Sequence, residues 1–148
     1  MTKLKLKTGG WIVVCDGSRA LILENAGDEK FPNLKTRETY QQDNPPTHAQ
    51  GTDAPGRSIS SVGHGRSSME QTDWHEQAER EFLRGLAERL DSAVKAHQVS
   101  AMIVVAPPRA LGVLRQSYSS GLRAVVVEEL HKDLVKMPVH EIEKHLLG

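Results

Sequence analysis

The chain of 148 residues is poor in cysteine and has no long apolar run. Its single cysteine, Cys15, excludes an internal disulfide and the paired-cysteine spacing of a structural zinc site. The longest apolar runs, such as residues 101–106 and 124–127, have the length of a strand and fall far below the roughly 20 residues of a membrane span. The lysine-rich residues 1–7 lack the apolar core of a signal peptide. We therefore expect a cytoplasmic protein with no membrane partner.

Neither sign of charge is in excess, since 19 lysines and arginines stand against 19 aspartates and glutamates. A chain without net charge does not attract nucleic acid through its overall field, so any contact with phosphates must come from a local group of cations. At this length a single domain, residues 1–148, can bury a sizeable core. The composition does not assign an oligomeric state.

Three strand signals occupy the first forty residues. Residues 11–15 are apolar on both faces, as in a central strand that is covered on two sides. Asp16 and Gly17 are a turn signal, after which residues 19–24 form the returning strand. Residues 34–40 alternate only weakly, through Leu34, Thr36, Glu38 and Tyr40, and fit an edge strand with one face toward water.

Helices alternate with strands in the second half of the chain. Apolar side chains recur at helical spacing over residues 74–97, and Asp73 and Glu76 have the spacing of a capping box at its start. Residues 101–106 are a second strand that is apolar on both faces. The remaining elements are a helix, a strand and a helix at residues 108–118, 124–127 and 138–147.

The predicted order of elements is β-β-β-α-β-α-β-α, which is typical of an α/β, ribonuclease-H-like fold. A meander of three strands is followed by two right-handed crossovers, giving a mixed five-stranded sheet with helices on both faces. The fourth strand should then lie parallel to the first. Phe82, Leu86 and Leu90 should be buried against the sheet.

A loop of about thirty residues, 41–73, rich in glycine, serine and proline, interrupts this pattern. Structureless stretches longer than roughly 12–15 residues are uncommon inside a small domain and are usually functional or disordered. The loop leads into the N-terminus of the long helix, where backbone N–H groups and the positive end of the helix dipole favour anions. It is therefore the first candidate for a functional site.

A nuclease site is incomplete in this sequence. Two-metal nucleases need carboxylates that converge at strand ends. Asp16 ends the first strand, but the strand at residues 101–106 is followed by two prolines and no acid. The better interpretation is that Asp16 makes the hairpin turn. His140 and His145 are five residues apart, about 140° around a helix, so they do not readily share an ion. We predict neither a metal nor a cofactor.

Nucleophilic catalysis has weak support. Cys15 lies within an apolar strand, which is typical of an inert core thiol. Ser67 and Ser68 lie near His64 and Asp73 in the sequence and, with Asp16, form a weak alternative catalytic set. The glycine-flanked serine of a hydrolase elbow and the phosphate-binding glycine loop are both missing.

Arg109 is a separate anion-binding candidate. It follows the buried strand at residues 101–106, in the first turn of the next helix, where open α/β sheets form their binding crevices. The alternative is that Leu111 and Leu114 pack this helix on the sheet while Arg109 remains solvated.

Four stretches of the chain carry a family resemblance: Trp11 to Ala20, Gly65-Arg66-Ser67, Ala106-Pro107-Pro108 with Leu111-Gly112 and Leu114-Arg115, and Leu134, Pro138, Glu141-Ile142 and His145-Leu146. They look like the bacterial host-attachment protein family, which is described as required for attachment to host cells. The fold of that family is similar to the middle domain of eukaryotic and archaeal peptide-chain release factors, itself ribonuclease-H-like. The resemblance therefore implies the fold that the order of elements also predicts.

The release-factor likeness bears on the loop. In release factors, a loop of the form His-Gly-Arg-Gly-Gly-Gln precedes the long helix and enters the ribosomal peptidyl-transferase centre. His64, Gly65 and Arg66 match its first half, whereas Ser67-Ser68-Met69 stands where the Gly-Gly-Gln tip would be. The resemblance thus implies RNA- or anion-facing positions at His64, Gly65 and Arg66, and leaves the hydrolytic role without a residue.

The leading hypothesis is a non-enzymatic, cytoplasmic protein that binds the ribosome or structured RNA. Its contacts would come from Arg57, His64, Gly65 and Arg66, with Arg109 as a further candidate. Two alternatives remain open. One is a hydrolase that uses the loop at residues 61–73, and the other is a protein-interaction module that regulates attachment.

Overall fold

The computed structural model describes residues 5–42 and 67–147, and for residues 67–73 it describes the backbone alone. The strands in these residues are β1 (Trp11–Cys15), β2 (Arg19–Asn25), β3 (Leu34–Gln41), β4 (Met102–Ala106) and β5 (Val126–His131). The helices are α3 (Ser67–Lys95), α4 (Pro108–Ser117), α5 (Ser120–Val125) and α6 (Val139–Leu146).

The sheet is mixed and has the strand order β3-β2-β1-β4-β5. β2 is antiparallel to both β1 and β3, whereas β4 is parallel to β1 and β5 is parallel to β4. Ile12 lies opposite Ile103 in the central parallel pair. The predicted pairing of the first and fourth strands is therefore confirmed, and so is the ribonuclease-H-like, five-stranded α/β class.

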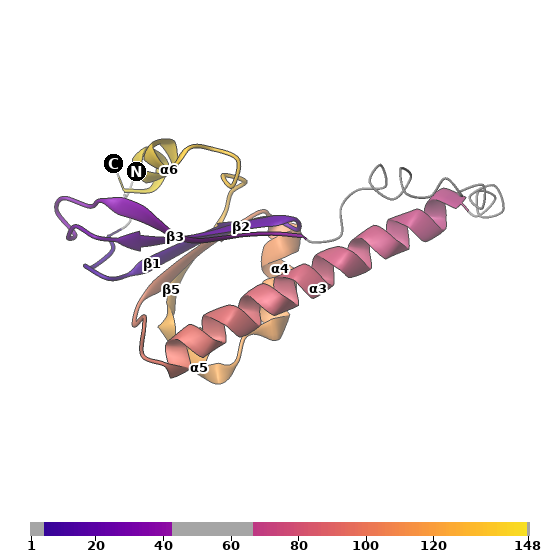
Figure 1. Ribbon diagram of the computed structural model, residues 1–148, viewed down its shortest axis with the longest axis horizontal. Coiled ribbons are helices and arrows are strands. Elements are labelled where there is room, and N and C mark those ends of the chain that lie inside the picture. The colour runs from indigo at the N-terminus through magenta and orange to yellow at the C-terminus, as the bar shows by residue number, and fades with distance from the viewer. Residues whose placement is uncertain (1–4, 43–66, 148) are drawn as a thin grey trace.

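Helices cover both faces of the sheet, with α3, α4 and α5 on one face and α6 on the other (Figure 1). Successive side chains of a strand point to opposite faces. Trp11, Val13 and Cys15 accordingly join the core on the α3 face, while Ile12 and Val14 join the core on the α6 face. Burial on both sides explains why β1 is apolar at every position.

The N-terminus of α3 differs from the prediction. The helix begins at Ser67, so Ser67, Ser68 and Asp73 belong to it and not to the loop. Asp73 is the seventh helical residue, and the predicted capping box with Glu76 is therefore wrong. The physical reason is that residues 67–73 contain no glycine or proline, while Met69 is among the good helix formers in this stretch.

The rest of α3 follows the amphipathic pattern. Leu86 and Leu90 are buried at 4% and 0% exposure, as predicted. Phe82 was also expected to be buried, but it lies at the margin of this core and is only half-buried. The helix ends at Lys95, two residues before the predicted end, because His97 adopts a left-handed backbone with φ of 59°.

The last strand also differs from the prediction. Residues 124–127 were expected to form it, but α5 takes the first two of them and β5 runs on to His131. The hydroxyl of Ser119 accepts a hydrogen bond from the backbone N–H of Leu122 at 3.1 Å and so caps a helix that the sequence pattern did not reveal. The short helix shifts the strand by two residues.

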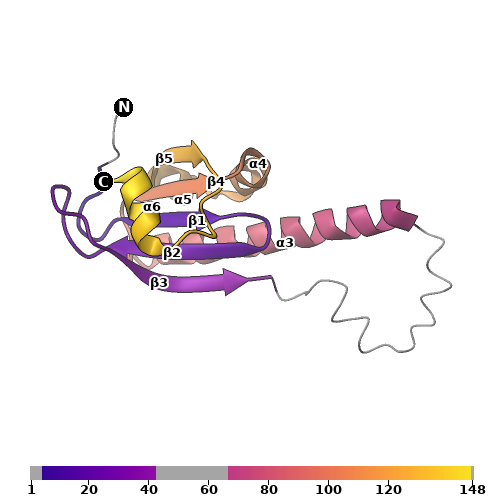
Figure 2. The ribbon, with the colours of Figure 1, turned by 90° about the horizontal axis from the view of Figure 1, so that it is seen from above.

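The N-terminal part of α3 extends well past the sheet, on the side where β3 ends (Figure 2). This part of the helix therefore lacks the sheet contacts that bury Leu86 and Leu90. Among the described residues, no helix combines the length and the apolar character that crossing a membrane requires.

Candidate functional site

Four of the predicted RNA-facing residues, Arg57, His64, Gly65 and Arg66, lie outside the described residues. The structure does describe the two elements that flank this segment. β3 leads into it at Gln41, and α3 follows it at Ser67. The end of β3 and the N-terminal half of α3 are therefore where a site built around this segment would continue.

Asp16 makes the hairpin turn, as the sequence indicated. Its Oδ1 accepts hydrogen bonds from the backbone N–H groups of Ser18 and Arg19 at 2.8 and 2.9 Å. The Ser18 hydroxyl donates a third bond to the same oxygen at 3.2 Å. This oxygen holds the reversal between β1 and β2, which is a sufficient structural role for the residue.

Acids of α3 reach the carboxyl end of β1, but they do not form a metal site there. The Glu79 side chain packs against Gly17 so closely that a Cβ on this glycine would lie 2.7 Å from Glu79 Cδ. Glu76 Oε2 pairs with the Arg109 guanidinium at 3.1 Å. Within the described residues, no three histidine, cysteine, aspartate or glutamate side chains are grouped so that they could hold a metal ion.

Arg109 lies where the sequence predicted, in the first turn of α4 at the end of β4. Its side chain is 65% exposed, but its charge is balanced by Glu76. An anion arriving here would have to displace or tolerate that carboxylate. The arrangement therefore favours the interpretation of Arg109 as a solvated ion-pair partner.

The described residues bear on two of the candidates for nucleophilic catalysis. Cys15 is completely buried, and burial, with a smaller contribution from the charge of Asp16, raises the pKa of its thiol to about 12. It is therefore protonated near neutral pH and is a poor nucleophile. Ser68 and Asp73 are five residues apart on the backbone of α3, about 140° around the helix, so they do not share a face.

A groove between the end of β3 and the middle of α3 is a site that the sequence did not indicate. It has a volume of about 440 Å³. We call it the β3–α3 groove, and its walls include Tyr40, Gln41, Gln42, Phe82, Leu86 and Arg89. Tyr40 is 38% exposed and Phe82 half-buried, so two aromatic rings remain partly accessible beside polar amides.

A bidentate ion pair ties the two walls of this groove together. Arg89 on α3 donates from Nε to Glu38 Oε1 at 2.8 Å, and from a terminal nitrogen to the other carboxylate oxygen. The Tyr40 hydroxyl donates to Glu38 Oε1. The hydrogen bonds from Arg89 lower the pKa of the Glu38 carboxyl, and the same bonds raise the pKa of Arg89.

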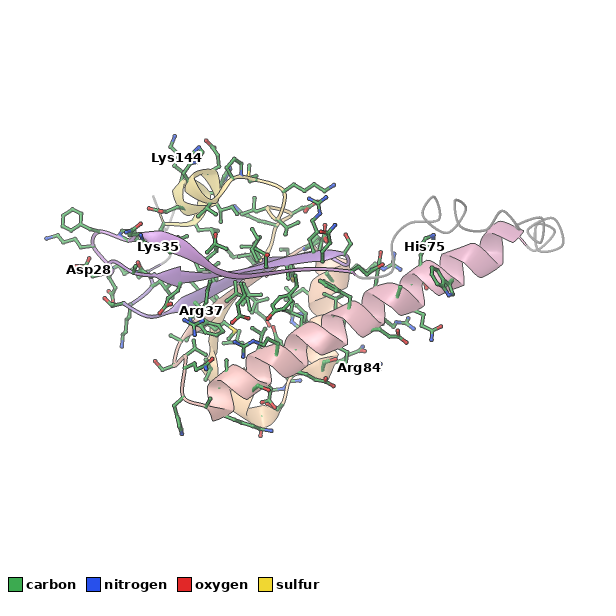
Figure 3. The ribbon with its side chains drawn as sticks, in the orientation of Figure 1. Asp28, Lys35, Arg37, His75, Arg84 and Lys144 are labelled. Atoms are coloured by element: carbon green, nitrogen blue, oxygen red, sulfur yellow. The ribbon has the colours of Figure 1, made fainter. Side chains whose placement is uncertain are left out.

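The part of α3 beyond the sheet carries an exposed tryptophan. Trp74 is 44% exposed, and its ring meets that of His75 edge-on with centroids 5.8 Å apart. His75 lies on the stretch of the helix that has left the sheet, and Arg84 lies on the side of α3 turned away from the sheet (Figure 3). An aromatic pair and a solvated cation are thus available on one projecting helix.

Comparison with known proteins identifies the family. The family model described as "Protein required for attachment to host cells" matches residues 11–146. An uncharacterized protein of Rickettsia prowazekii (strain Madrid E), RP470, is 34% identical over 67 residues. That match covers 44% of this chain and 45% of the relative, so the aligned part spans just under half of the curated protein's length.

A solved structure is also similar to this chain. It is the ethanolamine utilization protein EutJ from Carboxydothermus hydrogenoformans, at 16% identity, covering 86% of this chain and 46% of that chain with a TM-score of 0.39. We draw no functional conclusion from a likeness of this size. The family match spans nearly the whole chain, and the protein therefore belongs to the family of proteins required for attachment to host cells.

Proposed function

We propose that this protein is a non-catalytic, cytoplasmic RNA-binding protein whose partner is structured RNA, including the RNA of the ribosome. The observation that carries the proposal is the projection of α3 past the sheet with Trp74 exposed on it. Exposed aromatic rings beside cations are how proteins hold unpaired bases, which stack on the ring while the cations neutralise phosphates.

The arrangement of charge fits a local contact. The chain has no net charge, so RNA is not attracted by the molecule as a whole. Arg66 directly precedes α3 in the sequence and Arg57 lies further upstream, while Arg80 and Arg84 are exposed on α3. The likeness to release-factor middle domains remains a prediction, and without a Gly-Gly-Gln tip it favours binding over hydrolysis.

Binding to a labelled RNA hairpin and co-sedimentation with ribosomes, each at low and high salt, test the proposal. Removing Arg57 or Arg66 should reduce the slope of log affinity against log salt by roughly one unit, because each arginine neutralises one phosphate. Trp74→Ala should weaken binding about tenfold or more, since stacking on one aromatic ring contributes about 1–3 kcal/mol per base.

Phe31→Ala is the matched control. Phe31 is 72% exposed, more than Trp74, but it lies in the turn between β2 and β3, where its backbone N–H donates to Asp28 Oδ1. Asp28 lies at the opposite end of the molecule from His75 (Figure 3). Its removal should leave RNA binding unchanged. Failure of the unaltered protein to bind RNA or ribosomes at low salt would refute the proposal and leave the protein-interaction module as the better hypothesis.

Catalysis needs its own measurement. Cleavage of peptidyl-tRNA by the unaltered protein would overturn the non-catalytic proposal and favour the hydrolase alternative. Replacing Ser67-Ser68-Met69 by Gly-Gly-Gln restores the missing release-factor tip. On our proposal, only the replaced chain has a residue that can orient the attacking water, so any cleavage should require the replacement.

A further inference from the structure

We propose that the β3–α3 groove binds one unstacked nucleobase of the RNA. The inference rests on the proposed RNA-binding function and specifies a base-binding pocket within it. Three features of the groove support the inference: its aromatic walls, the fixed guanidinium of Arg89, and its net negative charge.

The walls suit a flat aromatic ring. Tyr40 from β3 and Phe82 from α3 line the groove together with Leu86, and its volume of about 440 Å³ is within the range of small-ligand pockets. Every nucleobase has a flat π-face, so an aromatic wall binds it by stacking whatever the base. An apolar floor with few polar groups is also the usual composition of such pockets.

The polar groups of the groove are held in place before a ligand arrives. Arg89 has five N–H donors, and the bidentate contact with Glu38 uses two of them. The remaining donors belong to a guanidinium that cannot swing away, and they can donate to a base carbonyl oxygen. The Gln42 amide is anchored because its Nε2 donates to the Gly17 carbonyl at 3.0 Å.

The charge of the groove selects the base over the phosphate. Glu38 compensates the charge of Arg89, and Glu81 on the same rim adds a further negative charge. A phosphate would meet net negative charge here, whereas a neutral ring would not. The phosphates of a bound strand should therefore stay outside the groove.

The groove is also continuous with the exposed tryptophan. Trp74, Ala78 and Phe82 are successive i, i+4 neighbours, so they form one stripe along α3. Trp74 and Phe82 are eight residues apart, which corresponds to about 12 Å along the helix axis. A strand that stacks one base on Trp74 is thus led along the same face of α3 toward the groove.

Two glycines supply a matched pair of variants. Gly85 on α3 lines the groove, Gly112 lies on α4 away from it, and a Cβ added to either would meet nothing within 4 Å. Gly85→Leu should fill the groove, whereas Gly112→Leu should not touch it. Each replaces a helical glycine by a better helix former, so neither variant is expected to lose the fold.

The probe is a labelled RNA hairpin with a single-stranded loop, compared with hairpins in which one loop nucleotide at a time is abasic. For the unaltered protein, the abasic position that belongs in the groove should weaken binding about tenfold, the effect of losing one stacked base, and Trp74→Ala should leave that effect in place. Gly85→Leu should weaken binding of the intact hairpin by the same factor and abolish the effect of that abasic position, with the salt slope unchanged. Gly112→Leu should behave like the unaltered protein.

The outcomes separate the groove from the function. If RNA binds but Gly85→Leu changes neither its affinity nor the effect of any abasic position, the groove is not a base pocket and the proposed RNA binding stands. If no hairpin binds at low salt, both proposals fall. Phe82→Leu is an independent check, because it removes one of the two aromatic walls and keeps an apolar side chain there; it should reduce the effect of the abasic position in the groove.

Discussion

Among the described residues, the ion pair between Glu38 and Arg89 supplies the side-chain hydrogen bonds that join β3 to α3 at the groove. Its contribution to stability can therefore be predicted from the structure. The two side chains are 21% and 29% exposed. Two unit charges about 4 Å apart attract each other by about 4 kcal/mol at an effective dielectric constant near 20. Partial desolvation and lost side-chain freedom offset most of that, while the bidentate geometry strengthens the bond. We expect a net coupling of about 1–2 kcal/mol.

A double-mutant cycle measures this coupling. Urea unfolding of the unaltered chain, Glu38→Gln, Arg89→Gln and the double variant gives four free energies of unfolding, and their combination isolates the pair. Glutamine keeps the shape of Glu38 and is a good helix former in place of Arg89. The control is the same cycle on Asp91 and Lys95, an i, i+4 pair on α3 whose lysine is largely exposed, and its coupling should be smaller than that of Glu38 and Arg89.

The coupling should depend on pH in one direction. The pKa of Glu38 is lowered in the folded protein, so its contribution to stability is fully present above its ordinary value of 4.5 and is lost as the pH falls through the folded value. Repeating the cycle in acid should therefore show a smaller coupling. A coupling below about 0.3 kcal/mol at pH 7, or one that persists once Glu38 is protonated, would refute the argument that this pair holds the groove together.

Three further predictions concern the core and the turn. Leu86→Ala should lower the free energy of unfolding by roughly 2–5 kcal/mol, measured in urea, because the side chain is 96% buried; a loss below about 0.5 kcal/mol would contradict its packing. Asp16→Ala should cost about 1 kcal/mol through the lost turn hydrogen bonds, and full stability of this variant would argue against the turn role. Cys15 should resist thiol reagents at pH 8 until urea unfolds the chain, since its pKa is raised to about 12; mass spectrometry of labelled protein decides this.

The buried strands were predictable because burial on both faces restricts which residues a strand can contain. β1 and β4 are covered on both faces, and a strand buried in this way must be apolar at every position. The apolar face of α3 was equally visible, because burial against a sheet requires apolar residues at helical spacing. The two apolar strands and the amphipathic helix, together with the order of elements, were sufficient to predict the mixed sheet and the parallel pairing of β1 with β4.

The ends of elements were less predictable, since they depend on single hydrogen bonds and not on periodic burial. α5 begins where the Ser119 hydroxyl caps it, and Ser119 hydrogen-bonds in turn to Asp91 on α3, 28 residues away. α3 starts seven residues before the predicted position because nothing in its first turns stops a helix. Neither feature appears as a repeat of apolar residues.

The sequence by itself determined the family, the fold class and the buried strands. Each of these can be recognised from a local motif or from the periodic spacing of apolar residues. The tertiary structure alone decided which charged groups meet. Glu38 and Arg89 are 51 residues apart, and Glu76 and Arg109 come from different helices. No sequence spacing therefore predicts that either pair forms. The β3–α3 groove exists only because a sheet edge and a projecting helix converge in space, and its polar wall is fixed by a contact between residues far apart in the sequence.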